Sequence, residues 1–213
     1  MAAVERPVLP VADPAPLGLG AFALTTFVLS VHNAGWAPSV IWIGLAIFYG
    51  GLAQLLAGMW EFRRNNTFAS TAFSTYGAFW LALGTFVILN DLTSLKLADT
   101  AESEALGWYL FAFAVFNTYM LFWSTRVNAA VFSVFLTLEI TEILLFIGFW
   151  SGDGAGEGWV KVGGWLGVVT AAAAWYASSA GVVNSLGVRP IVPVGAPLWP
   201  EETAVSRAER TVP

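Results

Sequence analysis

The chain contains no cysteine, a single histidine and few charged residues. Without cysteine there is no disulfide, no thiolate metal site, no iron–sulfur cluster and no cysteine nucleophile. No Gly-x-x-x-x-Gly-Lys motif is present to bind nucleotide phosphates. Charged residues make up 11% of the chain, against about 25% in a typical soluble domain. We therefore expect a membrane protein that is not an enzyme, with no metal, no cofactor and no nucleic-acid partner.

Long apolar stretches take the place of the missing charges. Crossing the hydrocarbon core of a bilayer takes a helix of roughly 20 residues. Six stretches qualify, at residues 17–34, 39–60, 70–91, 105–123, 129–150 and 161–184. They are too long and too uniformly apolar for the alternating strands of a porin. The sequence predicts an all-α, multi-pass integral protein of the cell (plasma or inner) membrane with six transmembrane helices.

The stretches divide the chain into a short N-terminal segment (1–16), a membrane domain (17–184) and a C-terminal tail (185–213). Basic residues are unevenly shared between the two sides of such a topology. The side with both termini holds Arg6, Arg63, Arg64, Arg126, Arg189, Arg207 and Arg210. The other side holds Lys96 and Lys161. Short basic loops stay in the cytoplasm, so we predict that both termini are cytoplasmic.

A proline-rich segment leads into the first span. It reads Asp13-Pro14-Ala15-Pro16-Leu17-Gly18-Leu19, and Asp13 before Pro14 is typical of a helix N-cap followed by proline. The segment resembles the Asn-Pro-Ala-Pro-Leu-Gly-Leu signature of the acetate uptake transporter family, with Asp13 in place of the asparagine. This family includes bacterial succinate–acetate permease and yeast relatives linked to acetate uptake and ammonia export.

The resemblance extends along almost the whole membrane domain. Similar blocks follow in order and at matching spacing: Thr25-Thr26, 32–35, 47–54, 66–68, 71–80, 164–167 and 192–195. It implies six helices per subunit, a homohexamer and one pore in each subunit. It also implies that Phe22, Tyr76 and Leu138 form an apolar constriction in that pore.

Helix geometry agrees with the placement of these three residues. The first, third and fifth spans run in the same direction through the membrane. Phe22, Tyr76 and Leu138 lie 5, 6 and 9 residues beyond the expected starts of those spans. At about 1.5 Å per residue, they reach similar depths of roughly 8 to 14 Å.

Two acids in the fifth span, Glu139 and Glu142, stand where the bacterial permeases are uncharged. An acid inside a membrane is costly and usually faces protein or a water-filled cavity. Burial and mutual repulsion favour a retained proton on one of them. One interpretation is a protonatable relay, in which Glu139 exchanges the proton beside Leu138 and Glu142 favours its protonated form. The alternative is a neutral, hydrogen-bonded acid in a helix or subunit contact.

Other polar residues in the spans are candidates for the pore wall. We select Thr25, Thr26, Thr75 and Asn117, although threonine hydroxyls also bond their own helix backbone. We interpret His32 as a hydrogen-bonding residue near a span end rather than a proton switch. Gln54 is expected to bond across helices, and Trp80 to be a packing residue.

The function that fits best is a permease or channel for acetate and related short carboxylates, with succinate a candidate. The apolar constriction and the absence of lysine or arginine within the spans favour the protonated acid or proton-linked passage. The expected partners are the carboxylate, membrane lipid and further copies of the chain. Two alternatives remain open: a membrane sensor of acetate or pH, and a permease for ammonia or another small neutral solute.

Overall fold

The computed structural model describes residues 11–38, 40–93, 96–187 and 189–200, and every regular element in them is a helix. The helices are α1 (Ala15–Asn33), α2 (Ile41–Ile47), the π-helix η1 (Phe48–Ala53), α3 (Gln54–Arg63), α4 (Thr67–Leu92), α5 (Asp99–Ser124), α6 (Ala129–Trp150) and α7 (Gly158–Ser185). Six segments are long and apolar enough to cross a membrane, with α2, η1 and α3 joined into one span. The predicted six-helix membrane fold is therefore confirmed.

Some helices extend beyond the predicted apolar stretches, because polar residues continue the helix at its ends. The predicted stretch 129–150 coincides with α6, whereas α5 begins at Asp99 rather than at 105. Its first turn carries Asp99 and Glu102, which favour the positive end of the helix dipole. The second span likewise continues past 60 to Arg63.

The prediction that Asp13 caps the first helix is wrong by one residue. Pro14 occupies the cap position of α1, and Pro16 lies in the first turn. The Asp13 carboxylate still accepts a hydrogen bond from the Ala15 amide at 3.0 Å. Proline has no N–H to be capped, so the first free amide of the helix is that of Ala15.

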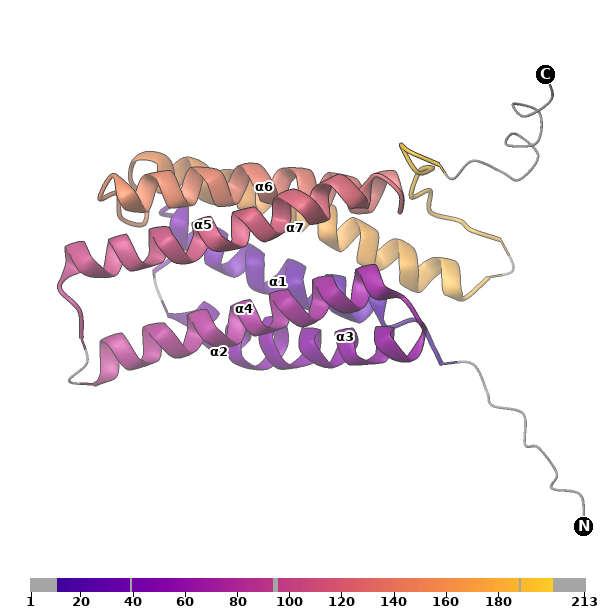
Figure 1. Cartoon of the computed structure of the whole chain (residues 1–213), viewed down its shortest axis with the longest axis horizontal. Helices are drawn as coiled ribbons and strands as arrows, with labels where there is room; N and C mark the ends of the chain where they lie inside the picture. The colour runs from indigo at the N-terminus through magenta and orange to yellow at the C-terminus, as the bar shows by residue number, and fades with distance from the viewer. Residues whose placement is uncertain (1–10, 39, 94–95, 188, 201–213) are drawn as a thin grey trace, which may run out of the picture.

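The helices run roughly along the long axis of the molecule (Figure 1). Helix α7 packs between α1 and α6, α5 packs on α6, and α4 packs on the α2–η1–α3 span. The described chain begins and ends at the same end of the bundle, which we call the terminus end (Figure 1). The opposite end, with the loops after α1, α4 and α6, is the far end. The side of the membrane that each end faces stays a prediction.

Small residues allow close packing in the most extensive helix contact, between α1 and α7. A Cβ atom added to Gly164 would lie 2.4 Å from the Ala34 amide nitrogen, and one added to Gly167 would meet the Ser30 hydroxyl. The backbones are therefore too close for any larger side chain. This contact holds α1 in place, and α1 carries Phe22.

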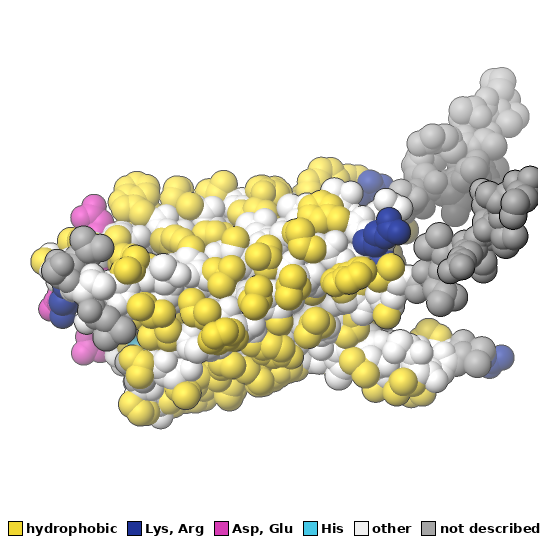
Figure 2. All heavy atoms as spheres, turned by 90° about the horizontal axis from the view of Figure 1, so that it is seen from below, with side chains coloured by type: hydrophobic (Ala, Val, Ile, Leu, Met, Phe, Trp, Pro, Cys, Tyr) yellow, Lys and Arg dark blue, Asp and Glu magenta, His cyan; other side chains and the backbone are white. Residues whose placement is uncertain are grey.

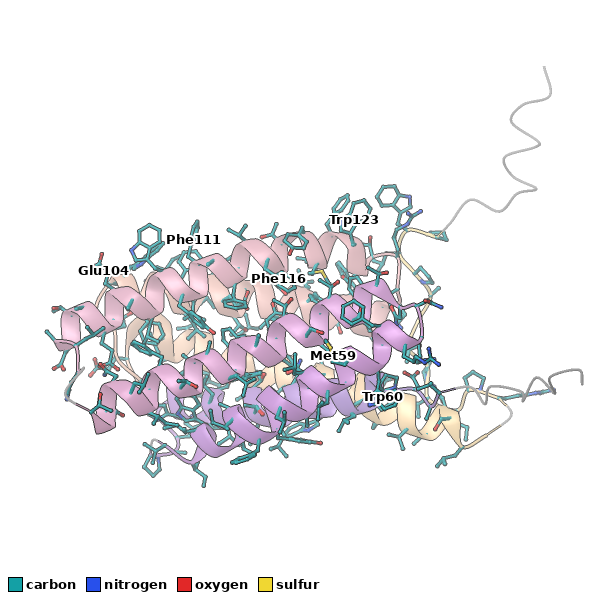
Figure 3. All side chains as sticks on the ribbon, turned by 60° about the horizontal axis from the view of Figure 1, so that its bottom comes forward. Met59, Trp60, Glu104, Phe111, Phe116 and Trp123 are labelled. Carbon is teal, nitrogen blue, oxygen red and sulfur yellow. The ribbon has the colours of Figure 1, made fainter. Side chains whose placement is uncertain are left out.

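Apolar side chains cover the outside of the bundle. The face in Figure 2 is hydrophobic along its length, with charged side chains gathered at its two ends. Aromatic residues of α5 such as Phe111 and Trp123 project outward (Figure 3). A surface of this kind suits a lipid bilayer or a neighbouring subunit.

The segment after α7 folds back on the terminus end. The Asn184 side chain accepts from the amides of Ile191 and Val192, and the Val194 carbonyl accepts from Ala130 at the start of α6. Part of the expected tail thus packs against the bundle. Residues 1–10 and 201–213, with Arg6, Arg207 and Arg210, lie outside the described residues.

Candidate functional site

Two cavities lie inside the bundle, one toward each end. The far-side cavity has a volume of about 290 Å³ and is lined by residues that include Asn33, Asp91 and Glu142. The terminus-side cavity has a volume of about 390 Å³ and is lined by residues that include Asp13 and Asn184. Each is large enough for a short carboxylic acid. Together they extend from one end of the bundle toward the other.

The three residues expected at the constriction lie where the cavities meet. Phe22 from α1, Tyr76 from α4 and Leu138 from α6 are the described residues that line both cavities. All three side chains are buried. The rings of Phe22 and Tyr76 meet edge to face with centroids 5.7 Å apart. The parallel course of α1, α4 and α6 therefore brings the three side chains to one level.

Tyr76 belongs to a buried hydrogen-bonded group that joins three helices. Its hydroxyl lies 2.9 Å from Oδ1 of Asn117 on α5 and 3.3 Å from Oε1 of Glu142 on α6. The amide nitrogen of Asn117 donates to the Phe135 carbonyl at 3.0 Å and to Oε2 of Glu139 at 2.7 Å. These bonds fix the orientation of the Tyr76 ring at the meeting point of the cavities.

The two acids of α6 occupy different environments. Glu142 is 2% exposed and lines the far-side cavity. Glu139 lines neither cavity and accepts from Asn117 and from the Thr118 hydroxyl on α5. The expectation that Glu139 is the acid beside the pore therefore does not match the structure.

Helix periodicity explains this difference. The cavity wall on α6 includes Leu138, Thr141, Glu142 and Leu145. These residues follow the spacing i, i+3, i+4, i+7 of a single helix face. Glu139 is adjacent to Leu138 in sequence, which turns it about 100° around the helix. It consequently faces α5.

Of the four polar residues selected from the sequence as candidates for the pore wall, one lines a cavity and the others do not. Thr26 lines the far-side cavity, and within the part of the chain that the structure describes its hydroxyl has no hydrogen-bond partner. Thr25 donates to the carbonyl of Ala21 within its own helix. Neither cavity wall includes Thr25, Thr75 or Asn117. Asn117 instead contacts the Tyr76 hydroxyl from outside the two cavity walls and holds it in place.

The signature segment contributes to the terminus-side cavity. Asp13, Ala15 and Pro16 are part of its wall. Pro16 accepts a hydrogen bond from the Ser178 hydroxyl of α7, and a Cβ at Gly18 would collide with the Phe73 ring of α4. The segment therefore locks the start of α1 between α4 and α7.

The main residue that sequence reasoning missed is Arg64. It lines the terminus-side cavity and pairs with Asp13 at 2.5 Å, with Glu61 also 3.7 Å away. The charge that Asp13 introduces is thus balanced. Glu61 was placed outside the second span, but α3 continues past it and buries its side chain completely. The signal in the sequence was the i, i+3 spacing of Glu61 and Arg64, which lets opposite charges pair across one helical turn.

Three further residues line the cavities, although the sequence did not select them for the pore wall. Trp80 packs in the hydrophobic core, as expected, and its ring meets that of Phe79. It also lines the far-side cavity, where its indole nitrogen has no hydrogen-bond partner among the described residues. Gln54 was expected to bond across helices, but its side-chain oxygen has no hydrogen-bond partner in the described helices and loops; the residue lines the terminus-side cavity instead. His32 lies within 3.3 Å of the Ala37 carbonyl, as a hydrogen-bonding residue would, and also lines the far-side cavity.

Comparisons with known proteins extend over most of the chain. A model of the GPR1/FUN34/yaaH family matches residues 3–195. Acetate permease A of Emericella nidulans is 42% identical over 213 residues, which is 94% of this chain and 71% of that protein. Ammonia transport outward protein 2 of Saccharomyces cerevisiae is 41% identical over 184 residues, which is 84% of this chain and 64% of that protein.

Bacterial relatives match over almost their full length. The succinate-acetate/proton symporter SatP of Escherichia coli strain K12 is 38% identical over 185 residues, covering 86% of this chain and 95% of that protein. The solved structure of the bacterial acetate channel SatP superimposes with a TM-score of 0.81 and 35% identity. It covers 87% of this chain and all of that one.

Proposed function

The chain belongs to the GPR1/FUN34/yaaH family, and on that premise we propose that it is a membrane permease or channel for acetate and related short carboxylates, succinate included. Passage is of the protonated acid or is linked to a proton. The observation that carries the proposal is the pair of cavities that meet at Phe22, Tyr76 and Leu138. Two relatives are named for acetate transport, which supports the same substrate class.

The three side chains provide the chemistry of a narrow apolar constriction. Two aromatic rings and one aliphatic side chain offer favourable contact to the methyl end of a short acid. They offer no cation to a carboxylate, so a charged acid would have to shed its water without compensation. The constriction therefore favours small solutes that pass in neutral form.

Arg64 brings a cation to the wall of the terminus-side cavity, but two carboxylates accompany it. Among the described residues that line the two cavities, it is the only arginine or lysine. Its side chain is about one-third exposed, and its guanidinium faces the carboxylates of Asp13 and Glu61. These two carboxylates match or exceed its charge, so the cavity wall has no net positive charge with which to concentrate an anion.

The decisive experiment is counterflow of labelled acetate in liposomes that contain the purified full-length chain. We expect exchange of acetate, competition by succinate and a loss of exchange in the Leu138→Trp variant, which fills the constriction. Liposomes without protein are the control for diffusion of the free acid. Flux of labelled methylamine without acetate flux would replace the proposal by an ammonia permease, the activity for which one yeast relative is named. Acetate binding without any flux would indicate a sensor.

The resemblance to hexameric permeases leads us to propose a homohexamer with one pathway in each subunit. Outward-facing aromatic residues of α5 supply apolar surface for contacts between subunits (Figure 3). Native mass spectrometry from lipid nanodiscs measures the subunit number directly. A monomer or dimer there would contradict this assembly and leave the transport proposal unaffected.

A further inference from the structure

The far-side cavity contains buried polar atoms that no group in the described residues satisfies. Within the described residues, Thr26 Oγ1, Trp80 Nε1 and Glu142 Oε2 are buried without a hydrogen-bond partner, and all three residues line this cavity. An unpaired buried polar group costs about 1–3 kcal/mol, so proteins rarely leave three in one place. Their shared position beside the constriction indicates a site for a ligand with both donor and acceptor atoms.

Hydrogen-bond counting fixes the proton of the Tyr76 hydroxyl. Both amide hydrogens of Asn117 are used, toward the Phe135 carbonyl and toward Glu139 Oε2. The reverse amide orientation would set its oxygen against these two acceptors. Asn117 Oδ1 therefore faces Tyr76, and the single hydroxyl proton of Tyr76 is donated to it at 2.9 Å.

The contact between Tyr76 and Glu142 then depends on a proton held by Glu142. With the Tyr76 proton committed, Glu142 Oε1 interacts favourably only by donating to the Tyr76 oxygen. The 3.3 Å separation is also long for a hydroxyl bonded to an ionised carboxylate, which is usually about 2.5–2.7 Å. Glu142 Oε1 is thus the hydroxyl oxygen, and Oε2 is a carbonyl oxygen that can only accept.

The groups around Glu142 favour its neutral form. It faces Tyr76 from α4, Tyr109 from α5 and Glu139 one turn earlier on α6. The far-side cavity also contains His32 of α1, Asp91 of α4 and Glu102 of α5, and its described wall on α2 and α6 adds no basic residue. Within the described residues, both ion pairs belong to Arg64. A charged Glu142 would therefore have no counter-charge.

We propose that neutral Glu142 is a substrate-binding residue, whose Oε2 accepts a hydrogen bond from the protonated carboxyl group of a permeating short-chain acid. The indole N–H of Trp80 and the hydroxyl of Thr26 lie in the same cavity wall as donors for the acid's carbonyl oxygen. This inference rests on the proposed function and names the binding group. It also provides selectivity, because an acetate anion has no proton to donate to Oε2 and is disfavoured.

Infrared spectroscopy of the full-length protein in lipid tests the charge state without any transport assay. We expect the carbonyl band of a protonated carboxyl group near neutral pH, absent in Glu142→Gln and retained in the control Glu104→Gln. Glu104 is exposed at the far end of α5 (Figure 3). Acetic acid should shift this band, because its proton binds Oε2. Loss of the band in Glu139→Gln instead of Glu142→Gln, or a band that acetic acid leaves unchanged, would overturn the proposal.

Two substitutions at Glu142 test the same contact in flux. The amide of Glu142→Gln can donate to Tyr76 and keep an oxygen in the cavity, so we expect acetate exchange to persist. Glu142→Leu removes the acceptor at similar size, and exchange should fall at least about tenfold, or about 1.4 kcal/mol. Equal exchange by folded Glu142→Leu and wild type would refute the binding role. If the wild type moves no acetate at all, the proposed function fails, while the infrared band still decides the state of Glu142.

Discussion

At the residue scale, Leu138 is the aliphatic member of the constriction and the simplest one to resize. Its side chain faces the rings of Phe22 and Tyr76 from the opposite helix, and it lines both cavities. Shortening it connects the cavities more widely without touching the Tyr76 hydrogen bonds. Substitutions at Leu138 therefore test the width of the pathway without changing its polar groups.

We expect Leu138→Ala to admit bulkier acids such as lactate, measured as lactate inhibition of acetate uptake in proteoliposomes. Loss of a buried leucine side chain usually costs about 2–5 kcal/mol, so folding must be verified by thermal unfolding in detergent. Leu136→Ala is the matched control, because Leu136 is exposed on the outer face of the same helix. A folded Leu138→Ala variant with unchanged selectivity would remove Leu138 from the constriction.

The Asp13–Arg64 pair is a second feature at this scale. The side chains of Asp13 and Arg64 are 45% and 34% exposed, and solvent strongly screens the attraction within such a pair. Asp13→Ala should lower stability by about 1 kcal/mol or less. Asp13→Asn should lose less, since asparagine still accepts from Arg64 and from the Ala15 amide. Unfolding temperatures measured at low and high salt test this order, and equal losses in both variants would assign the effect to charge alone.

At the element scale, the contact between α1 and α7 sets the position of Phe22. A Cβ at Gly164 would approach backbone atoms of Asn33 and Ala34, which cannot rotate away as a side chain can. A Cβ at Gly44 on α2 has no atom within 4 Å. The two glycines thus differ in packing while sharing a helical backbone.

We predict that Gly164→Ala destabilises the protein by about 1–3 kcal/mol through overpacking. Gly44→Ala should be neutral or slightly stabilising, because alanine is favoured over glycine inside a helix by up to about 1 kcal/mol. Thermal unfolding of both variants in the same detergent measures the difference. If the two variants unfold together, the α1–α7 contact is looser than the structure indicates.

At the scale of the whole molecule, the even number of spans places both described ends of the chain together (Figure 1). Arg63, Arg64, Arg126 and Arg189 lie at this terminus end. The far end has many acidic residues, among them Asp91, Asp99, Glu102, Asp153 and Glu157. The positive-inside rule predicts that the terminus end faces the cytoplasm.

Single cysteines in this cysteine-free chain test the orientation. Thr67→Cys lies at the terminus end and Gly154→Cys at the far end, both at exposed positions. Thr67 is a better site than the neighbouring Asn65, whose φ of 58° disfavours most side chains. An impermeant thiol reagent added outside intact cells should label position 154 alone. Labelling at position 67 alone would reverse the topology.

The sequence by itself determined the number of spans, their approximate ends and the common level of Phe22, Tyr76 and Leu138. These properties depend on local hydropathy and on the constant rise of a helix, both of which can be counted along the chain. Family resemblance selected the three residues, and helix geometry agreed with the choice. The position of Glu142 on the same face of α6 as Leu138 could also have been counted, because Glu142 lies one helical turn after Leu138. The adjacency of Glu139 to Leu138 in sequence instead favoured Glu139 as the acid beside the pore.

Only the tertiary structure decided which polar atoms face the cavities and which are satisfied between helices. Asn117 is paired on three sides, whereas Thr26, Trp80 and Glu142 each present an unpaired atom to one cavity. It also paired Asp13 with Arg64 across 51 residues of sequence. Hydropathy measures how much a residue avoids water, but not its rotation about the helix axis or its partner. The packing of α1, α4, α5 and α6 against one another fixes both the rotation and the partner. A buried polar atom forms a hydrogen bond only where a neighbouring helix supplies a matching donor or acceptor.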